Sequence, residues 1–289
     1  MTDYQIITDS TCDLSQAAAD ALGLQIIPME FTLDGKNYRN YPDEREITNA
    51  AFYQAMRDGK MPQTTQITTA TFLDAFSPIL EQGKDLLYLG FTSGMSATYE
   101  RACMAVQELQ KRYPERKIYA VDTLCASIGE GFLAELCSEQ QQQGASIEEA
   151  KTWAETNRHH IAHWIAVDDL NHLKRGGRIS AASALVGGML NMKPIIHVDR
   201  DGKLVAAGKV RGRRQSMDDI ANRIVKTVSQ KPARIRIVHG DALEDAQYLE
   251  QKIRENLDVS ECAIYYVGPI IGSHTGPGMV AAVAYCSEK

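Results

Sequence analysis

The sequence has no long hydrophobic run, no excess of basic charge and no paired cysteines, and each absence excludes a class of protein. No apolar run approaches the roughly 20 residues that span a bilayer. The formal net charge of −6 argues against a protein that coats nucleic acid, because phosphate binding needs an excess of Lys and Arg. The six cysteines form no CxxC pair and no metal-ligand spacing, which indicates reduced thiols in the cytoplasm. The first ten residues contain two aspartates and no basic group, so they do not form a secretory signal.

Motifs for nucleotide and metal chemistry are also lacking. There is no Walker-type GxxxxGK[ST] sequence, which argues against ATP chemistry by this chain alone. Two glycine patterns begin at Gly129 and Gly276, but the first has no glycine in its turn, and the second lies too near the C-terminus to open a βαβ unit. His159, His160 and His163 have no partner Cys or acidic motif, so we expect no metal site.

The most informative stretch is 86–98, which reads as a buried strand, a hydroxyl-rich turn and the start of a helix. Residues 86–91 are a nearly continuous apolar run, typical of a parallel strand covered on both faces. Thr92, Ser93, Gly94 and Ser96 come directly after it. Ligands of open α/β sheets bind at the carboxyl ends of strands, and the next helix offers N–H groups to an anion. This stretch therefore predicts an anionic head group at Ser93.

Two further strands end in similar polar turns. Asp9-Ser10-Thr11 follows a strand over Tyr4–Asp9, and the turn 122–127 follows a strand over Lys117–Val121. Strands alternate with helical patterns through this half of the chain, so we expect a doubly wound, mostly parallel α/β domain over 1–157.

The second half predicts a different architecture, an α+β domain over 158–289 with a mixed or antiparallel sheet. Two apolar runs, Lys193–Val198 and Leu204–Val210, flank an Asp-Gly turn and indicate a β-hairpin. At 289 residues the chain exceeds the usual size of one core, which also favours two domains. Finer expectations are one strand over Gln25–Leu33, a helix capped at Thr71, a helix near Ser183 and a last helix from about Gly278.

Three other segments carry candidate binding groups. Thr64 and Thr65 lie in a loop, where no helix cap explains them. The run 209–214 is the strongest basic segment of the chain. The loop 272–278 combines His274 with several glycines, and an imidazole can donate to a carboxylate.

In this order, the motifs resemble the DegV family of bacterial lipid-binding proteins. The resemblance extends from residue 6 to residue 278. The segments that carry it are Ile7-Thr-Asp9-Ser-Thr-Cys-Asp-Leu14, Thr64-Thr-Gln66, Thr92-Ser-Gly-Met-Ser-Ala-Thr98, Leu173-Lys-Arg-Gly-Gly-Arg-Ile-Ser180, Lys193-Pro-Ile, Lys209-Val-Arg211 and His274-Thr-Gly-Pro-Gly278.

The resemblance implies a fatty acid buried between two domains, with its carboxylate held by loop hydroxyls and its tail in an apolar tunnel. The carboxylate ligands it implies are Ser93, Thr64, Thr65, Arg211 and His274, and secondarily Thr92, Gly94, Ser96, Gly276 and Arg178. It implies no cofactor, no metal and no catalytic residue in this chain.

The resemblance also implies a partner. Family members of known role resemble the acyl-carrying subunit of a fatty acid kinase, in which a separate ATP-dependent subunit phosphorylates the bound carboxylate for phospholipid synthesis. Arg211, or the pair Arg213 and Arg214, would then face that kinase or its nucleotide. Lipid exchange would need transient contact with a membrane, without integral insertion.

One alternative from another class is a serine esterase or acyl transferase. It would use Ser93 or Ser96 as nucleophile and His274 as base. Neither serine lies in a GxSxG sequence, but a triad assembled in space leaves no such signature.

Overall fold

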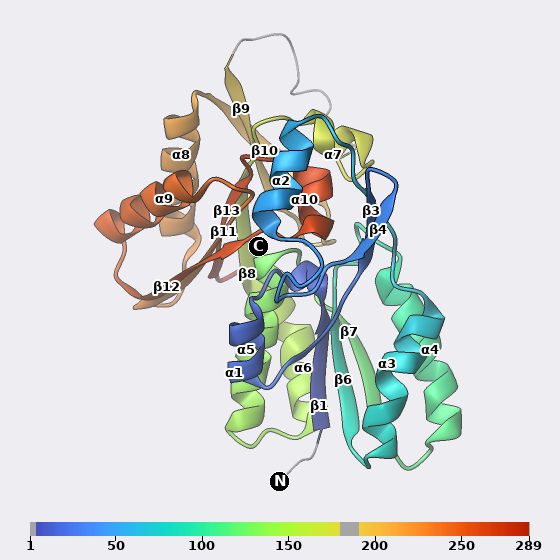
Figure 1. Cartoon of the computed structure of the whole chain (residues 1–289). Helices are drawn as coiled ribbons and strands as arrows, with labels where there is room; N and C mark the ends of the chain where they lie inside the picture. Colours follow the sequence, from blue (N-terminus) through green and yellow to red (C-terminus); the bar gives the residue numbers. More distant parts are fainter. Residues whose placement is uncertain (1–3, 180–190, 289) are drawn as a thin grey trace.

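The computed structural model describes residues 4–179 and 191–288, and the predicted helix near Ser183 lies outside them. The N-terminal half is built on a parallel sheet with strand order β2-β1-β6-β7, as the sequence predicted. Helices α3 and α4 cover one face, and α1, α5 and α6 cover the other (Figure 1). The strands are β1 (Tyr4–Asp9), β2 (Gln25–Ile27), β6 (Asp85–Gly90) and β7 (Ile118–Asp122). The helices are α1 (Gln16–Leu22), α3 (Thr69–Glu81), α4 (Thr98–Arg112), α5 (Ile128–Gln142) and α6 (Ile147–Asn157).

A small antiparallel sheet, with order β4-β3-β5, adjoins this half. Its strands are β3 (Glu30–Leu33), β4 (Lys36–Arg39) and β5 (Gln63–Thr64), and α2 (Asn49–Arg57) follows β4 in the chain. The prediction of one strand over Gln25–Leu33 is wrong, because β2 and β3 belong to different sheets. Pro28 stands between them and has no N–H to continue a ladder.

Local capping also differs from the sequence expectation. The side chain of Thr68, not Thr71, accepts the hydrogen bond that caps α3. Asp9 caps the short 3-10 helix η1 (Ser10–Cys12), and Ser15 caps α1. Several hydroxyls in one turn compete for the same N–H groups, so the sequence alone does not select the cap.

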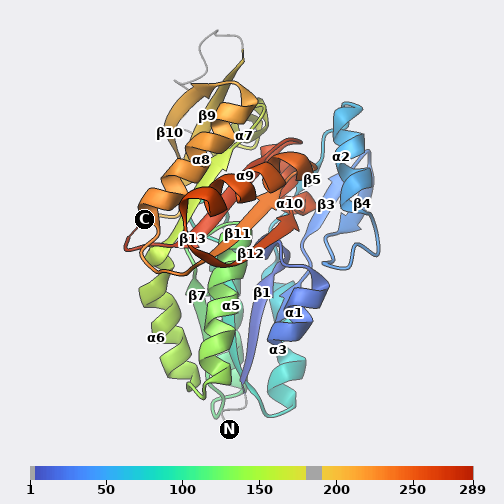
Figure 2. The same ribbon diagram turned by 90° about the vertical axis from the view of Figure 1, so that its left-hand side faces the viewer.

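The C-terminal half is built on a mixed sheet with order β10-β9-β8-β13-β11-β12, in which only β11 and β12 pair in parallel. Helices α8 and α9 pack on its outer face (Figure 2), and α5 contacts its inner face. The strands are β8 (Ile161–Ala166), β9 (Met192–Val198), β10 (Leu204–Arg211), β11 (Ala233–His239), β12 (Val259–Tyr266) and β13 (Val280–Tyr285). The helices are η2 (Arg158–His160), α7 (Asn171–Arg175), α8 (Arg213–Thr227), α9 (Leu243–Asn256) and α10 (Pro269–Thr275).

The predicted last helix from about Gly278 is wrong. Residues 280–285 form β13, which lies between β8 and β11 and is buried on both faces up to Ala284. The segment is rich in alanine, which has a high helix propensity, but central placement in the sheet overrides that preference. The helix is instead α10, which begins with Pro269 after Gly268.

One hydrophobic core runs through both halves. It contains side chains of β1, β6 and α5 together with Val238 of β11 and Val283 of β13. A second, smaller core lies between the mixed sheet and the helices α8 and α9. Helix α6 ends at Asn157 and β8 begins at Ile161, and the domain boundary near residue 157 stays a prediction. Among residues 4–179 and 191–288, no helix is both long and apolar enough to cross a membrane.

Candidate ligand-binding cavity

A cavity of about 230 Å³ lies between the carboxyl ends of the parallel strands and the inner face of the mixed sheet. Most of its lining is apolar. The mixed sheet contributes Ile165, Ile196, Val238, Ala281 and Val283, and α10 contributes Ile270 and Ile271. Such a cavity suits a ligand that is largely hydrocarbon.

The polar turns after β1, β6 and β7 all reach this cavity. Their lining residues are Thr11 after β1, Met95 to Ala97 after β6, and Ala126 to Ile128 after β7. The three strands are neighbours in the sheet, so their carboxyl ends share one edge. The structure therefore brings together the three strand ends that the sequence singled out.

One end of the cavity is polar and is built around His274. Its Nε2 lies 2.8 Å from Oγ1 of Thr64, which belongs to the small sheet of the N-terminal half. Burial, and then the positive charge of Arg178, lower the pKa of His274 to about 4, so the imidazole is neutral at pH 7. Thr64, Arg178 and His274 all line the cavity.

Two more hydroxyls that the sequence singled out, those of Thr65 and Ser96, line the cavity, each with a protein partner. Thr65 donates to the carbonyl of Glu30 at 3.2 Å. Oγ of Ser96 lies 2.9 Å from Oγ1 of Thr98 and also accepts from the Thr98 N–H. The proton of Thr65 is therefore engaged, whereas Ser96 can donate to a ligand if Thr98 donates to it.

Two candidates from the sequence lie elsewhere. Ser93 is exposed and does not line the cavity; its backbone N–H donates to Asp122 at 3.2 Å. Arg211, at the end of β10, is also exposed and is not a lining residue. Ser96 lies in the same turn as Ser93 and is the serine of that turn that reaches the cavity.

Three further candidates serve the packing of the backbone around the cavity. Oγ1 of Thr92 donates to the carbonyl of Gly202 at 3.0 Å, which joins the turn after β6 to the β9–β10 hairpin. A Cβ on Gly94 would lie 2.6 Å from the carbonyl oxygen of Asp201. Gly276 has a φ of +76°, and a Cβ there would meet the ring of His172. These residues therefore shape the cavity without lining it.

The structure does not place either candidate serine as a nucleophile beside His274. Neither Ser93 nor Ser96 hydrogen-bonds to His274, whose Nε2 faces Thr64. In the part of the chain that the structure describes, no group of three His, Cys, Asp or Glu residues could hold a metal ion. His163 lies in β8, and its ring packs against Gly129 of α5.

A cluster of buried carboxyl groups lies behind the cavity wall. The N–H of Thr11 donates to Asp9 at 3.0 Å, and the Thr11 hydroxyl lies between the carboxyl groups of Asp9 and Glu130. Desolvation raises the pKa of both acids. Asp13 accepts from the Gly268 N–H at 2.8 Å and from the Ser127 hydroxyl, and burial raises its pKa to about 8. Asp13 thus connects the start of α5 to the start of α10.

Sequence reasoning missed α10 and the lining role of Thr11 and Ser127. The sequence contained signals for α10: a Pro at the first helical position and a Gly directly after the last mark the ends of a short helix. Thr11 and Ser127 lie in turns already identified as strand ends, but a turn sequence does not say which of its side chains faces inward.

Comparisons with known proteins give one consistent result. A model of the family described as "Uncharacterised protein, DegV family" matches residues 3–287. A DegV domain-containing protein of Clostridium perfringens is 37% identical over 282 residues, covering 97% of each chain. One from Caldanaerobacter subterraneus is 30% identical over 290 residues and covers 100% of each.

Solved structures agree with the sequence relatives. A DegV family protein of Thermus thermophilus, described as fatty acid binding, has a TM-score of 0.88 and 31% identity, and covers 98% of this chain and 99% of its own. One from Streptococcus agalactiae, also described as fatty acid binding, has a TM-score of 0.86 and 25% identity over 100% of both chains.

Proposed function

Because the chain belongs to the DegV family, we propose that it binds a long-chain fatty acid in the cavity between its two sheets. The observation that carries the proposal is the pairing of Thr64 and His274, beside Arg178, at one end of a cavity that is otherwise mostly apolar. The fatty acid binding described for the Thermus thermophilus protein, at 31% identity, supports it.

The polar end has the chemistry that a carboxylate requires. A fatty acid is ionised at neutral pH, and burial of the charge without donors or a cation would be prohibitive. Arg178 supplies the cation, and Thr64 and Ser96 supply hydroxyls. A neutral His274 that carries its proton on Nε2 donates to Thr64, and this leaves the Thr64 proton for the ligand.

The apolar part of the cavity provides most of the affinity. Burial of methylene groups stabilises the complex by about 0.8 kcal/mol each, or about 10 kcal/mol for a palmitoyl-like chain before the cost of ordering it. A charge-assisted hydrogen bond contributes about 1.5–3 kcal/mol. The polar end therefore sets the orientation of the ligand, and the acyl chain sets the binding strength.

The second part of the proposal concerns the fate of the bound fatty acid. We propose that this chain is not itself an enzyme and presents the carboxylate to a separate ATP-dependent kinase, which forms an acyl phosphate for phospholipid synthesis in the cytoplasm. The exposed Arg211 would face that partner. Arg213 is held by Asp245 and Asp168, and Arg214 stacks on Tyr248, so these two are engaged within the chain.

The first test is mass spectrometry of the purified protein, in its native state and after organic extraction. We expect a stoichiometric fatty acid in both spectra. A protein that carries none and also takes up no added palmitate would overturn the proposal. Hydrolysis of a nitrophenyl ester that disappears in Ser96→Ala would instead favour the esterase.

The second test separates the two serines of the turn. We expect Ser96→Ala to weaken palmitate binding by roughly tenfold, as loss of one charge-assisted hydrogen bond implies. Ser93→Ala, three residues away and exposed, should bind as the wild type does. If Ser93→Ala weakened palmitate binding and Ser96→Ala did not, Ser93 would be the serine that binds the carboxylate.

A further inference from the structure

The cavity extends along the strands of the mixed sheet, and its inner end can be located from their register. Met279, Ala281 and Val283 alternate along β13 and all line the cavity. The five residues from Met279 to Val283 are separated by four steps and span about 13 Å at the usual rise of a strand. On β11, Val238 pairs with Ala281 and lines the cavity, whereas Arg236 pairs with Val283 and does not.

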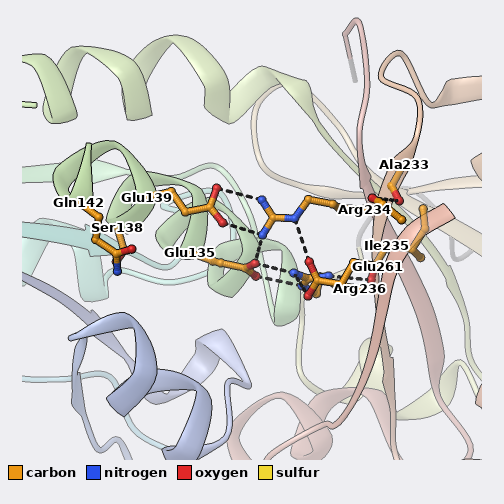
Figure 3. A network of polar contacts seen from close by, with 10 residues as sticks. Glu135, Ser138, Glu139, Gln142, Ala233, Arg234, Ile235, Arg236 and Glu261 are labelled. Carbon is orange, nitrogen blue, oxygen red and sulfur yellow. Dashed lines mark hydrogen bonds and ion pairs between the residues drawn. The ribbon is translucent and has the colours of Figure 1, made fainter. Parts of the chain in front are cut away.

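Arg236 is the next side chain on that face of the sheet. Directly opposed residues of antiparallel strands project to the same side, so its side chain lies beside that of Val283. It is only 1% exposed although it carries a charge. Its Nε donates to Glu135 of α5 at 2.9 Å and its Nη2 to Glu261 of β12 at 2.8 Å (Figure 3).

Helix α5 packs over this ion pair, and its start reaches the cavity. The ring of Phe132 lies 5.2 Å from the Arg236 guanidinium. One turn earlier, Gly129 packs so closely on His163 that a Cβ would lie 1.8 Å from Nε2. Ile128, at the start of the same helix, lines the cavity. The first two turns of α5 therefore pack closely on the mixed sheet, at the place where the residues that line the cavity end.

We propose that the Arg236–Glu135 ion pair is the stop that limits the length of the acyl chain. The inference rests on the proposed function, with the carboxylate at Thr64 and Arg178. A methyl terminus gains nothing by displacing a charged pair, because separating Arg236 from Glu135 breaks charge-assisted hydrogen bonds between side chains that are only 1% and 9% exposed. Apolar side chains at the same place would offer no such barrier.

The test replaces the pair by apolar side chains of similar length, Glu135→Met with Arg236→Met. Removing one positive and one negative charge together leaves no unpaired charge at this point, so the fold is expected to persist. Wild type and variant are loaded with an equimolar series of saturated fatty acids of increasing length, and the bound acids are extracted and identified by mass spectrometry. We expect the bound chains to lengthen by about two carbons.

An independent variant approaches the stop from the cavity side. Val283→Phe fills space in front of Arg236, so we expect it to shorten the bound chains by about two carbons. The matched control is Arg234→Gln with Glu139→Gln. These residues belong to the same network (Figure 3), in which Arg234 also binds Glu135. They lie two residues beyond Arg236 on β11 and one turn beyond Glu135 on α5, so they are farther from Val283 than the proposed stop is. The control should keep the wild-type profile.

The outcomes separate this inference from the proposed function. Normal loading with an unchanged length profile in the double Met variant overturns the stop and leaves fatty acid binding intact. A control that shifts as much as the double Met variant also overturns it. If the wild type takes up no fatty acid of any length, the proposed function fails, and the stop fails with it.

Discussion

Asp13 is a carboxyl group held in an environment that favours its neutral form. It is buried, its backbone has a φ of 54°, and its oxygens accept from the Gly268 N–H and the Ser127 hydroxyl. Its pKa rises from 3.8 to about 8 because burial penalises the charge. Between about pH 4 and pH 8 the folded protein therefore retains a proton that the unfolded chain releases.

The proton that Asp13 retains makes the free energy of unfolding depend on pH. Its contribution to the free energy of unfolding is present below about pH 4 and is lost as pH rises to about 8. In Asp13→Asn, the amide oxygen can accept from the Gly268 N–H and the amide NH₂ can donate to the Ser127 hydroxyl. The variant therefore keeps both contacts without holding the extra proton. We expect the variant to gain on the wild type as pH rises from about 4 to about 8, by on the order of 1 kcal/mol per pH unit. Urea unfolding at several pH values measures this difference.

A control at another carboxyl group makes the result specific. Asp74→Asn, on the exposed side of α3, should show a stability difference that varies little with pH. If the Asp13→Asn difference were equally constant from about pH 5 to about pH 9, Asp13 would not be the group that holds the proton.

At the scale of single residues, the sequence identified the segments that reach the cavity more reliably than the side chains that line it. The motif around residue 93 contained two serines, and the structure directs Ser96 into the cavity and leaves Ser93 outside. A turn reverses the direction of its side chains within two or three residues, so spacing alone cannot choose between them. His274 and Thr64 come from segments 210 residues apart, and only the fold shows their contact.

At the scale of elements, the turn of the β9–β10 hairpin docks on the turn after β6. Thr92 donates to the carbonyl of Gly202, and both Gly94 and Gly202 stand where a Cβ would clash. For Gly94 the nearest atoms are the backbone oxygens of Asp201 and Gly202, at 2.6 and 2.8 Å. Backbone atoms cannot rotate away as the end of a side chain can.

We therefore expect Gly94→Ala to separate the hairpin from the turn. The loss of stability should be about 1–3 kcal/mol, as for other overpacked sites, and palmitate should dissociate faster because Leu204, next to this hairpin turn, lines the cavity. Thermal unfolding and a stopped-flow release assay measure the two effects. Ser93→Ala in the same turn is the control. Wild-type stability in Gly94→Ala would mean that the two turns move apart without cost.

Elements with a clear hydrophobic period, or with a residue that breaks secondary structure, were predictable from sequence. Elements whose structure depends on the strands packed beside them were not. Helix α9 was predictable, because its polar and apolar residues recur with a helical period. The run 280–285 has no period of its own, and burial between β8 and β11 makes it a strand. The break at Pro28 was visible in the sequence, but the two sheets that it separates were not.

At the scale of the whole molecule, the two halves are joined more tightly than two domains linked by a chain. The larger hydrophobic core contains residues of both sheets. The hydroxyl of Tyr53 in α2 donates to the carbonyl of Val267 at 2.9 Å, and Glu135 binds Arg234 and Arg236 across the same boundary. The sequence predicted two domains from chain length and from the change to antiparallel pairing after residue 157. Neither observation contains information about how much surface the two domains share.

We expect this shared core to make unfolding cooperative. Differential scanning calorimetry should give one transition with equal calorimetric and van't Hoff enthalpies, because neither half can unfold without exposing the apolar side chains of the other.

Separate fragments 1–157 and 158–289 should be unfolded or aggregated, because each would present its half of the cavity and core to water. Two resolved transitions, or a fragment 158–289 with the circular dichroism of a folded sheet, would show that the halves are independent domains. Added palmitate should raise the single transition temperature of the whole chain, since a ligand between the halves binds only when both are folded.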